Sequence, residues 1–250
     1  MSDTTDPTQG LTAGQVREED APRQAITFLL VPGACHGGWW YEPLARHLGQ
    51  DGHIAVPITL AGLEDEPRLD QLITLASHID EVVAEVPATG LVVLVGHSYA
   101  GSVITAVADR LPERIAALVY LDAFLPEDGD SCWSIANDEQ RGWFVRGSAA
   151  TGYGIDPLPF FSDRARPHPV STVLQAVALT GEWRRVPVKH YVQAQWPGES
   201  PLALSTRRAK ADAGILTHDW DIRHNVLADG PDRVLQLLRT LPNYGEQQEQ

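Results

Sequence analysis

The chain has 250 residues, of which 43% are apolar and 21% charged, a composition typical of one soluble α/β domain with a substantial core. Its formal net charge of −14 argues against nucleic acid or an anionic membrane as a partner, because both favour a basic surface. The sequence shows no membrane-length apolar stretch, no signal-peptide pattern and no recognisable metal-ligand spacing, so we expect no membrane, no metal and no cofactor.

Polar segments flank a region in which strand and helix signals alternate. Residues 1–23 and 246–250 lack periodicity, and they are predicted to be a disordered leader and a disordered tail. The alternation across residues 24–245 predicts one domain built on a mostly parallel, twisted sheet with helices on both faces.

The predicted elements follow from apolar periodicity and from Pro and Gly breaks. In chain order they are strand Ile26–Val31, helix Glu42–Leu48, strand Ile54–Val56, helix Leu69–Val86, strand Val92–Val95, a helix ending near Leu111, strand Ile115–Leu121, strand Val186–Val192, strand Asp219–Ile222 and helix Pro231–Leu241. The helix over 69–86 is expected to bury a face that includes Leu72, Leu75 and Ile79.

The regular alternation stops over residues 126–185, which are rich in aromatic residues, Pro and Gly. In this architecture such an insertion is typical of a lid over an active site, although a separate hydrophobic cluster would give the same pattern. Under the lid interpretation, Trp133, Trp143 and Phe160 line the substrate pocket, together with Cys35 and His36 from the loop after the first strand.

The two cysteines, Cys35 and Cys132, are far apart in the sequence and form no C-x-x-C motif. This usage predicts two buried, reduced thiols and a cytoplasmic protein. The sequence does not determine an oligomeric state.

The segment Gly96-His97-Ser98-Tyr99-Ala100-Gly101 lies between an apolar strand and a helix. A small-x-Ser-x-small turn in that context is typical of a nucleophile elbow, which exposes the serine hydroxyl at the end of the sheet. Ser98 is therefore the predicted nucleophile. A strand-to-helix turn with a chance serine is the alternative.

A serine nucleophile needs a base, and in this chain order the base must lie late, after the last strand. His224 follows the predicted strand Asp219–Ile222, whereas His218 precedes it at the opposite end. We therefore expect His224 to be the base.

The acid that orients the base has two candidates. Asp122 stands directly at the end of the predicted strand Ile115–Leu121, at the edge of a parallel sheet where catalytic groups gather. Glu199 lies in the loop after the strand near Tyr191, where the acid is usually found, but behind a Pro-Gly turn. We favour Asp122, and Glu199 remains the alternative.

An oxyanion hole requires two backbone N–H groups. One is expected from Tyr99, directly after the nucleophile, and the other from Ala34, in the Gly- and Ala-rich loop 32–39 that allows close backbone approach.

The segment 29–40, Gly96-His97-Ser98, Ala123-Phe124-Leu125-Pro126 and the spacing from His224 to Pro231 together resemble the plant methylesterase and hydroxynitrile lyase group of α/β-hydrolases. The resemblance covers most of residues 25–242 and is weak over 126–185. It implies the α/β-hydrolase fold. The basic residues are nearly all arginine, with Lys189 and Lys210 as the two lysines, which favours a bacterial member of the group.

The chain departs from this group at informative positions. The loop after Tyr191 lacks the group's acid and has Pro197 near its place, while Asp122 stands where plant members carry a small apolar residue. The acid has thus moved between strands, which favours Asp122. Asn225 replaces the Lys that follows the histidine in the lyases, so cyanohydrin cleavage is not expected.

The leading hypothesis is a serine hydrolase that cleaves an ester, lactone or thioester of a hydrophobic small molecule through an acyl-enzyme. A lyase, C–C hydrolase or cyclase acting on a natural-product intermediate is the alternative on the same scaffold. The third hypothesis is a pseudo-hydrolase that binds a ligand without catalysis.

Overall fold

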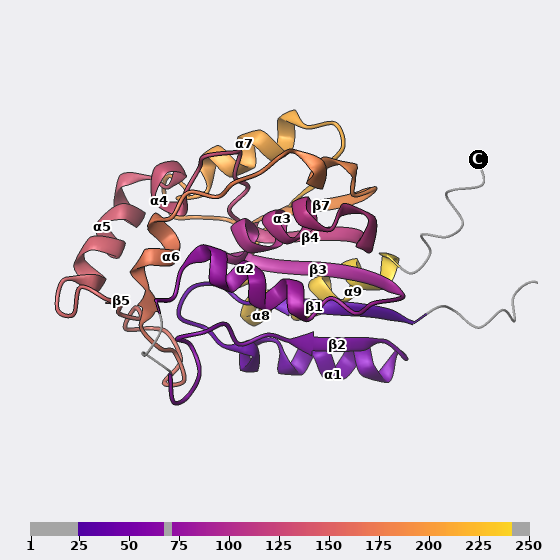
Figure 1. The fold of residues 1–250 in the computed structure, drawn as a ribbon, viewed down its shortest axis with the longest axis horizontal. Coiled ribbons are helices and arrows are strands. Elements are labelled where there is room, and N and C mark those ends of the chain that lie inside the picture. Colours follow the sequence, from indigo (N-terminus) through magenta and orange to yellow (C-terminus); the bar gives the residue numbers. More distant parts are fainter. Residues whose placement is uncertain (1–24, 68–71, 242–250) are drawn as a thin grey trace, which may run out of the picture.

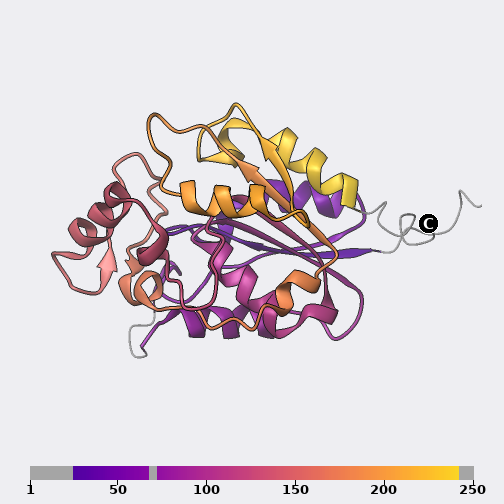
Figure 2. The ribbon, with the colours of Figure 1, turned by 90° about the horizontal axis from the view of Figure 1, so that it is seen from above.

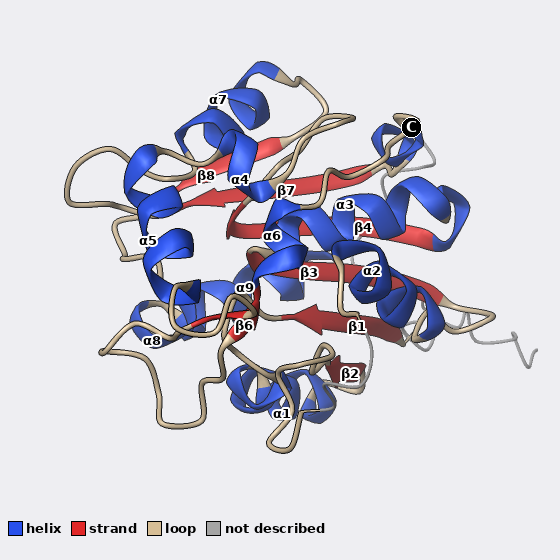
Figure 3. Ribbon diagram, turned by 60° about the vertical axis from the view of Figure 1, so that its left-hand side comes forward, coloured by secondary structure: helices blue, strands red, loops and turns tan. Residues whose placement is uncertain are grey.

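The computed structural model describes residues 25–67 and 72–241. The predicted leader 1–23 and tail 246–250 lie outside the described residues. The central feature is a six-stranded sheet with the order β2-β1-β3-β4-β7-β8, in which every neighbouring pair is parallel (Figures 1 and 3). The prediction of a mostly parallel sheet is thereby confirmed.

The strands have short apolar sequences, and helices connect strands that run parallel in the sheet. The bounds are β1 Ile26–Val31, α1 Glu42–Gln50, β2 Ile54–Pro57, α2 Leu75–Ala84, β3 Leu91–Ser98, α3 Ala100–Arg110, β4 Ile115–Ala123, β7 Val188–Gln193, α7 Ala203–Ala211, β8 Leu216–Asp219, α8 Val226–Asp229 and α9 Pro231–Thr240.

Both faces of the sheet are covered, as predicted. In β3, Val92 and Leu94 belong to the core beneath α2 and α3, whereas Val93 and Val95 belong to the opposite core beneath α1 and α9. This alternation reflects the two-residue period of a strand. Figure 2, which looks along the layers, shows α1 and α9 on one side of the sheet and α2 and α3 on the other.

The helix predicted over 69–86 begins later than expected, at Leu75. Thr74 caps it, since its hydroxyl accepts the Ser77 amide and the Ser77 hydroxyl accepts the Thr74 amide in return. Leu72 precedes this cap and is 80% exposed, so its predicted place on the buried face is wrong. Leu69 lies outside the described residues.

The last strand is also displaced from its predicted position. β8 spans Leu216–Asp219 rather than Asp219–Ile222, because Leu216 pairs with His190 and Asp219 with Gln193 of β7. It is an edge strand whose Leu216 is 58% exposed, so its sequence lacks the apolar alternation that marks a strand.

The insertion between β4 and β7 contains α4 Cys132–Ile135, α5 Asp138–Ser148, β5 Gly154–Ile155, β6 His168–Pro169 and α6 Val170–Leu174. β5 and β6 form a separate antiparallel pair. In Figure 1 most of this insertion lies beyond the left-hand end of the sheet, the end at which the strands finish. The insertion therefore adjoins the edge that carries Ser98.

Cys35 and Cys132 are both free and buried, as predicted. Within residues 25–67 and 72–241, no helix is long and apolar enough to cross a membrane. The same part of the chain holds no group of three or more His, Cys, Asp or Glu side chains arranged to hold a metal ion.

Candidate active site

Ser98 is the last residue of β3 and has a left-handed backbone, with φ of 53°. A non-glycine residue rarely adopts this conformation, which the sharp turn into α3 requires here. The turn is tight: a Cβ on Gly96 would lie 3.0 Å from the Ala100 carbonyl oxygen. The small residues around Ser98 thus allow the strand-to-helix turn that presents its half-buried hydroxyl.

His224 lies in the loop between β8 and α8 and contacts Ser98. Its Nε2 is 3.1 Å from the Ser98 Oγ, so the hydroxyl donates to the imidazole. Its Nδ1–H donates to Asp122 Oδ2 over 2.6 Å. The structure therefore brings the three residues together in the order serine, histidine, aspartate. In this order the imidazole can take the serine proton, and the carboxylate can stabilise the imidazolium that forms.

Asp122 occupies a β-bulge at the end of β4. Leu121 pairs with His97 and Ala123 with Ser98, so Asp122 is an extra residue in β4, and its φ is 43°. Bulges beside active sites re-aim a side chain that the regular pleat would direct elsewhere. Here the bulge accompanies the contact between the Asp122 carboxylate and His224.

The Asp122 carboxylate is fully buried, yet it does not lack partners. In addition to His224, it accepts the Ala194 amide at 3.1 Å and the Trp196 Nε1–H at 2.9 Å. Both donors come from the loop after β7. Three hydrogen bonds replace the water that burial removed, which makes a buried carboxylate tolerable at this position.

The alternative acid and the alternative base lie elsewhere. Glu199 is exposed, and its backbone oxygen accepts a hydrogen bond from the Asn137 side chain. His218 lies inside β8 rather than before the strand, and its Nε2 is 2.9 Å from His190 Nδ1. Neither side chain hydrogen-bonds to Ser98 or His224 in the described part of the chain.

Sequence reasoning missed His97, which directly precedes the nucleophile. Its Nε2–H donates to the His224 carbonyl oxygen at 2.9 Å, and its ring stacks on Trp40 with the centroids 4.5 Å apart. Burial holds the pKa of His97 well below its usual value, so the imidazole stays neutral. The position inside Gly96-His97-Ser98 was the available signal, because a side chain beside the nucleophile must point toward neighbouring loops.

The loop after β1 packs directly against the nucleophile. A Cβ on Gly33 would lie 3.0 Å from the Ser98 Cβ and 2.8 Å from His97 Nδ1, so only glycine allows this approach. The next amide, that of Ala34, and the Tyr99 amide donate no hydrogen bond to another described residue. Two backbone donors beside Ser98 are thus free to bind an oxygen.

The predicted pocket residues have different environments. Cys35 is fully buried, and burial raises its thiol pKa to about 12, so it stays protonated. His36 is half-buried; its Nδ1 contacts the Ala34 carbonyl oxygen at 2.8 Å, and its ring lies 4.9 Å from that of Phe161. Phe161 is therefore the aromatic ring that the insertion brings to His36, which also lies beside Trp39 and Trp40, whereas Phe160 is 80% exposed.

The two tryptophans belong to the same aromatic cluster. Trp143 lies 6.3 Å from Phe161 and 5.4 Å from Phe144, and its Nε1–H donates to the Asp156 carbonyl. Trp133 is half-buried and lies 6.5 Å from Phe144. The cluster links the insertion to the loop that carries Ala34 and His36.

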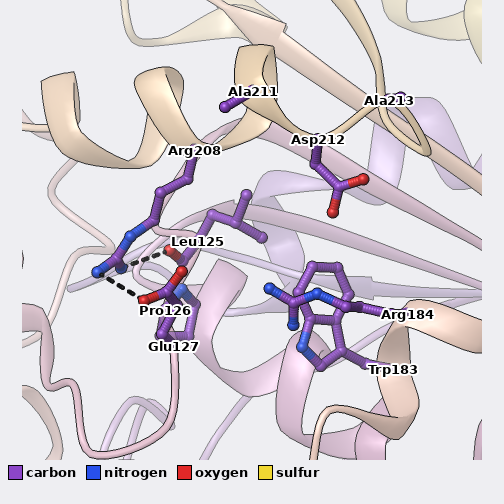
Figure 4. Close-up of a pocket in the computed structure, with 9 residues that line it drawn as sticks. All are labelled: Leu125, Pro126, Glu127, Trp183, Arg184, Arg208, Ala211, Asp212 and Ala213. Carbon is purple, nitrogen blue, oxygen red and sulfur yellow. Dashed lines mark hydrogen bonds and ion pairs between the residues drawn. The ribbon is translucent and has the colours of Figure 1, made fainter.

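A cleft of about 420 Å³ lies away from Ser98, between α7 and the segment before β7 (Figure 4). Its lining is strongly charged: Arg208 hydrogen-bonds to the Leu125 carbonyl and pairs with Glu127, and Asp212, directly after α7, lines it together with Arg184 from the segment before β7. Such a lining does not suit a hydrophobic substrate, and none of the three catalytic candidates forms part of it.

Comparison with known proteins gives a consistent result. A family model described as the alpha/beta hydrolase family matches residues 28–237. A carbendazim hydrolyzing esterase from Nocardioides sp. (strain SG-4G) is 32% identical over 86% of this chain and 98% of its own length. Methylesterase 10 from Arabidopsis thaliana is 30% identical over 64% of this chain and 57% of its own length.

Among solved structures, an extracellular alpha/beta-hydrolase from a Paenibacillus species superposes with a TM-score of 0.71. It is 22% identical, and the match covers 86% of this chain and 98% of that one. This likeness supports the fold expected from the sequence.

Proposed function

Because this chain belongs to the alpha/beta hydrolase family and is a hydrolase of the carboxylic ester type, we propose that Ser98, His224 and Asp122 form its catalytic triad. The observation that carries the proposal is the continuous hydrogen-bonded chain from Ser98 Oγ through His224 to Asp122. A serine hydroxyl is a weak nucleophile at neutral pH, and this arrangement supplies the base that it lacks.

The proposed reaction proceeds in two halves. Ser98 Oγ attacks the ester carbonyl while His224 Nε2 takes the hydroxyl proton, and the same proton passes to the leaving alkoxide. Water, deprotonated by His224, then attacks the acyl-enzyme, and His224 returns that proton to Ser98 Oγ as the acid leaves. Asp122 keeps the Nδ1 proton in place, so that Nε2 remains available as the acceptor, and stabilises the imidazolium that forms.

The developing alkoxide is proposed to bind the Ala34 and Tyr99 amides. Both lie beside Ser98 and lack a protein acceptor among the described residues. Tyr99 also precedes α3, whose amino-terminal dipole favours negative charge at this point. Preorganised donors of this kind are usually the largest single contribution to such catalysis.

The proposed substrate is an ester, lactone or thioester of a hydrophobic small molecule. The support is the aromatic cluster between the oxyanion loop and the insertion, with Phe161 against His36 and Trp143 behind it. We propose that the insertion over 126–185 acts as the lid of this site.

We also propose that the protein is bacterial and works in the cytoplasm. Two cysteines that form no disulfide support the cytoplasm. A basic residue set with only two lysines, Lys189 and Lys210, supports the bacterial origin. Cell fractionation with an antibody would test this, and recovery from the culture medium would contradict it.

Labelling with a fluorophosphonate, followed by peptide mass spectrometry, tests the proposed mechanism. We expect one adduct on Ser98, absent in Ser98→Ala, and a fall in ester hydrolysis of about 10⁴-fold or more in that variant. A set of p-nitrophenyl esters of increasing chain length would report the preference for apolar acyl groups. Unlabelled, folded protein without hydrolysis would contradict the mechanism; hydrolysis retained in Ser98→Ala would indicate a non-covalent route, as in the lyase alternative.

A further inference from the structure

The residue after the proposed oxyanion donor has an unusual conformation. Cys35 follows Ala34, is fully buried, and has a left-handed backbone with φ of 67°. A non-glycine residue is strained in this region and stays there only when its surroundings hold it. The contacts that hold the Cys35 backbone also fix the orientation of the preceding residue, Ala34.

All three polar groups of Cys35 are bound by the β5–β6 part of the insertion. The Cys35 amide donates to His168 Nδ1 at 3.4 Å, the thiol donates to the Ile155 carbonyl at 3.6 Å, and the Cys35 carbonyl accepts the Arg166 amide at 3.0 Å. Figure 3 shows β6 beside the end of β1, from which this loop leaves. The oxyanion loop is thus tied to the insertion rather than to the sheet alone.

His168 makes the only one of these three bonds that depends on a side chain of the insertion. Because its Nδ1 accepts the Cys35 amide, the proton must lie on Nε2, which donates to Thr172 Oγ1 at 2.8 Å. That hydroxyl in turn donates to the Pro169 carbonyl at 2.7 Å. A protonated His168 would lose its acceptor, and complete burial prevents this by holding its pKa well below the usual value.

The same ring also contacts the second proposed oxyanion residue. The His168 ring packs edge-on against Tyr99 with the centroids 4.5 Å apart. On its other side, Tyr99 is held through its hydroxyl, 2.9 Å from His78 Nδ1. One imidazole of the insertion therefore contacts the neighbour of Ala34 and the side chain of Tyr99.

We propose that His168 is a positioning residue that aligns the two amides of the oxyanion hole, so that the insertion sets the rate of the chemical step as well as access to the site. The proposal rests on the proposed role of Ser98. It requires that loss of the Nδ1 acceptor weakens binding of the transition state more than binding of the substrate.

Two substitutions at His168 distinguish two possible roles: accepting a hydrogen bond at the position of Nδ1, and only filling the site with a polar side chain. His168→Asn places an oxygen near the position of Nδ1, whereas His168→Gln places its amide near Nε2 and leaves the Cys35 amide without an acceptor. His190→Gln is the matched control, because His190 is also a buried histidine but lies on β7 away from the loop.

The readouts are kcat and KM for a p-nitrophenyl ester, inhibition by a trifluoromethyl ketone that forms a tetrahedral adduct, and the Tm. We expect His168→Gln to lower kcat about 10- to 100-fold with KM within about twofold, and to weaken the ketone by the same factor, since a lost oxyanion donor costs about 10²–10³. His168→Asn should stay within about threefold of the wild type, and His190→Gln should match it.

Equal losses in His168→Asn and His168→Gln that follow Tm, or an unchanged kcat in folded His168→Gln, would overturn the proposal. If His168→Gln does not fold, Thr172→Val decides: it keeps the ring but removes the Nε2 partner, and kcat should fall about threefold at constant KM. Unchanged kcat there would overturn the proposal. Failure of the proposed function would look different. In that case the wild type itself would neither hydrolyse esters nor be labelled at Ser98, before any variant is compared.

Discussion

The ends of β3 and β4 are adjacent in the sheet, and each carries a non-glycine residue with positive φ, but they use it differently. At β3, Ser98 leads directly into α3, so the turn exposes a hydroxyl beside helical amides. At β4, Asp122 is a bulged residue, and the chain continues without a helix into the insertion. The left-handed conformation of Ser98 leaves its hydroxyl half-exposed, whereas that of Asp122 accompanies a fully buried carboxylate.

The two strand ends depend on neighbouring loops in different ways. The buried Asp122 carboxylate depends on donors from the loop after β7, namely the Ala194 amide and the Trp196 indole. Because the ends of β4 and β7 meet at one edge of the sheet, either strand can supply an acid to His224. In this chain β4 supplies the carboxylate that contacts His224, and the loop after β7 supplies the hydrogen bonds that hold it.

The largest effect should come from breaking the β4 end itself. Asp122→Asn keeps the shape but allows the wrong His224 tautomer, so we expect kcat to fall about 10³- to 10⁴-fold. Glu199→Gln, in the exposed loop after β7, should leave kcat within about twofold. Steady-state kinetics on both variants would check this, and the reverse ranking would move the acid to β7.

An intermediate effect on kcat should come from removing a hydrogen bond that the loop after β7 donates to Asp122. Trp196→Phe keeps a ring against His224, 4.7 Å away in the wild type, but removes the hydrogen bond to Asp122. A hydrogen bond to a buried charge is worth about 1.5–3 kcal/mol, so kcat should fall about tenfold or more. Gln195→Ala, at an exposed position in the same loop, is the control. Equal activity in both variants would show that Trp196 does not support the acid.

The smallest effect concerns stability and a histidine outside the proposed triad. Burial lowers the pKa of His78 to about 4, so the unfolded chain binds a proton below pH 6.5 that the folded chain does not. The free energy of unfolding should therefore fall with pH from 6.5 toward 4, by up to about 1.4 kcal/mol per pH unit for this group. Urea unfolding at pH 7 and 5 should show a smaller loss in His78→Gln than in the wild type. Equal losses would mean that His78 is protonated in the folded state.

Sequence reasoning was most informative where local pattern and tertiary structure agree. The turn around Ser98 and the strands β1, β3 and β4 follow from short-range apolar patterns, and these are buried on both faces. The predicted last strand begins three residues later in the sequence than β8, because an edge strand with an exposed Leu216 carries little apolar signal. The position of a strand that pairs on one side only depends on its neighbour β7.

The supporting residues were harder to predict than the candidates they support. Trp196 approaches Asp122 across 74 residues of chain, and His168 approaches Cys35 across 133. No periodicity encodes such contacts, which arise only when several loops meet at one sheet edge. The choice of Phe160 rather than Phe161 has the same origin, because two adjacent aromatic residues differ only in the direction that the loop gives them.

The NMR signal of the His224 Nδ1 proton reports whether Asp122 is the residue that binds and orients His224. A short hydrogen bond to a carboxylate strongly deshields that proton and slows its exchange with water. We predict one far-downfield resonance in the wild type that persists in Glu199→Gln and disappears in Asp122→Asn and His224→Ala, with amide spectra showing that each variant is folded. A resonance that survives in Asp122→Asn but disappears in Glu199→Gln would contradict the assignment of the acid to β4.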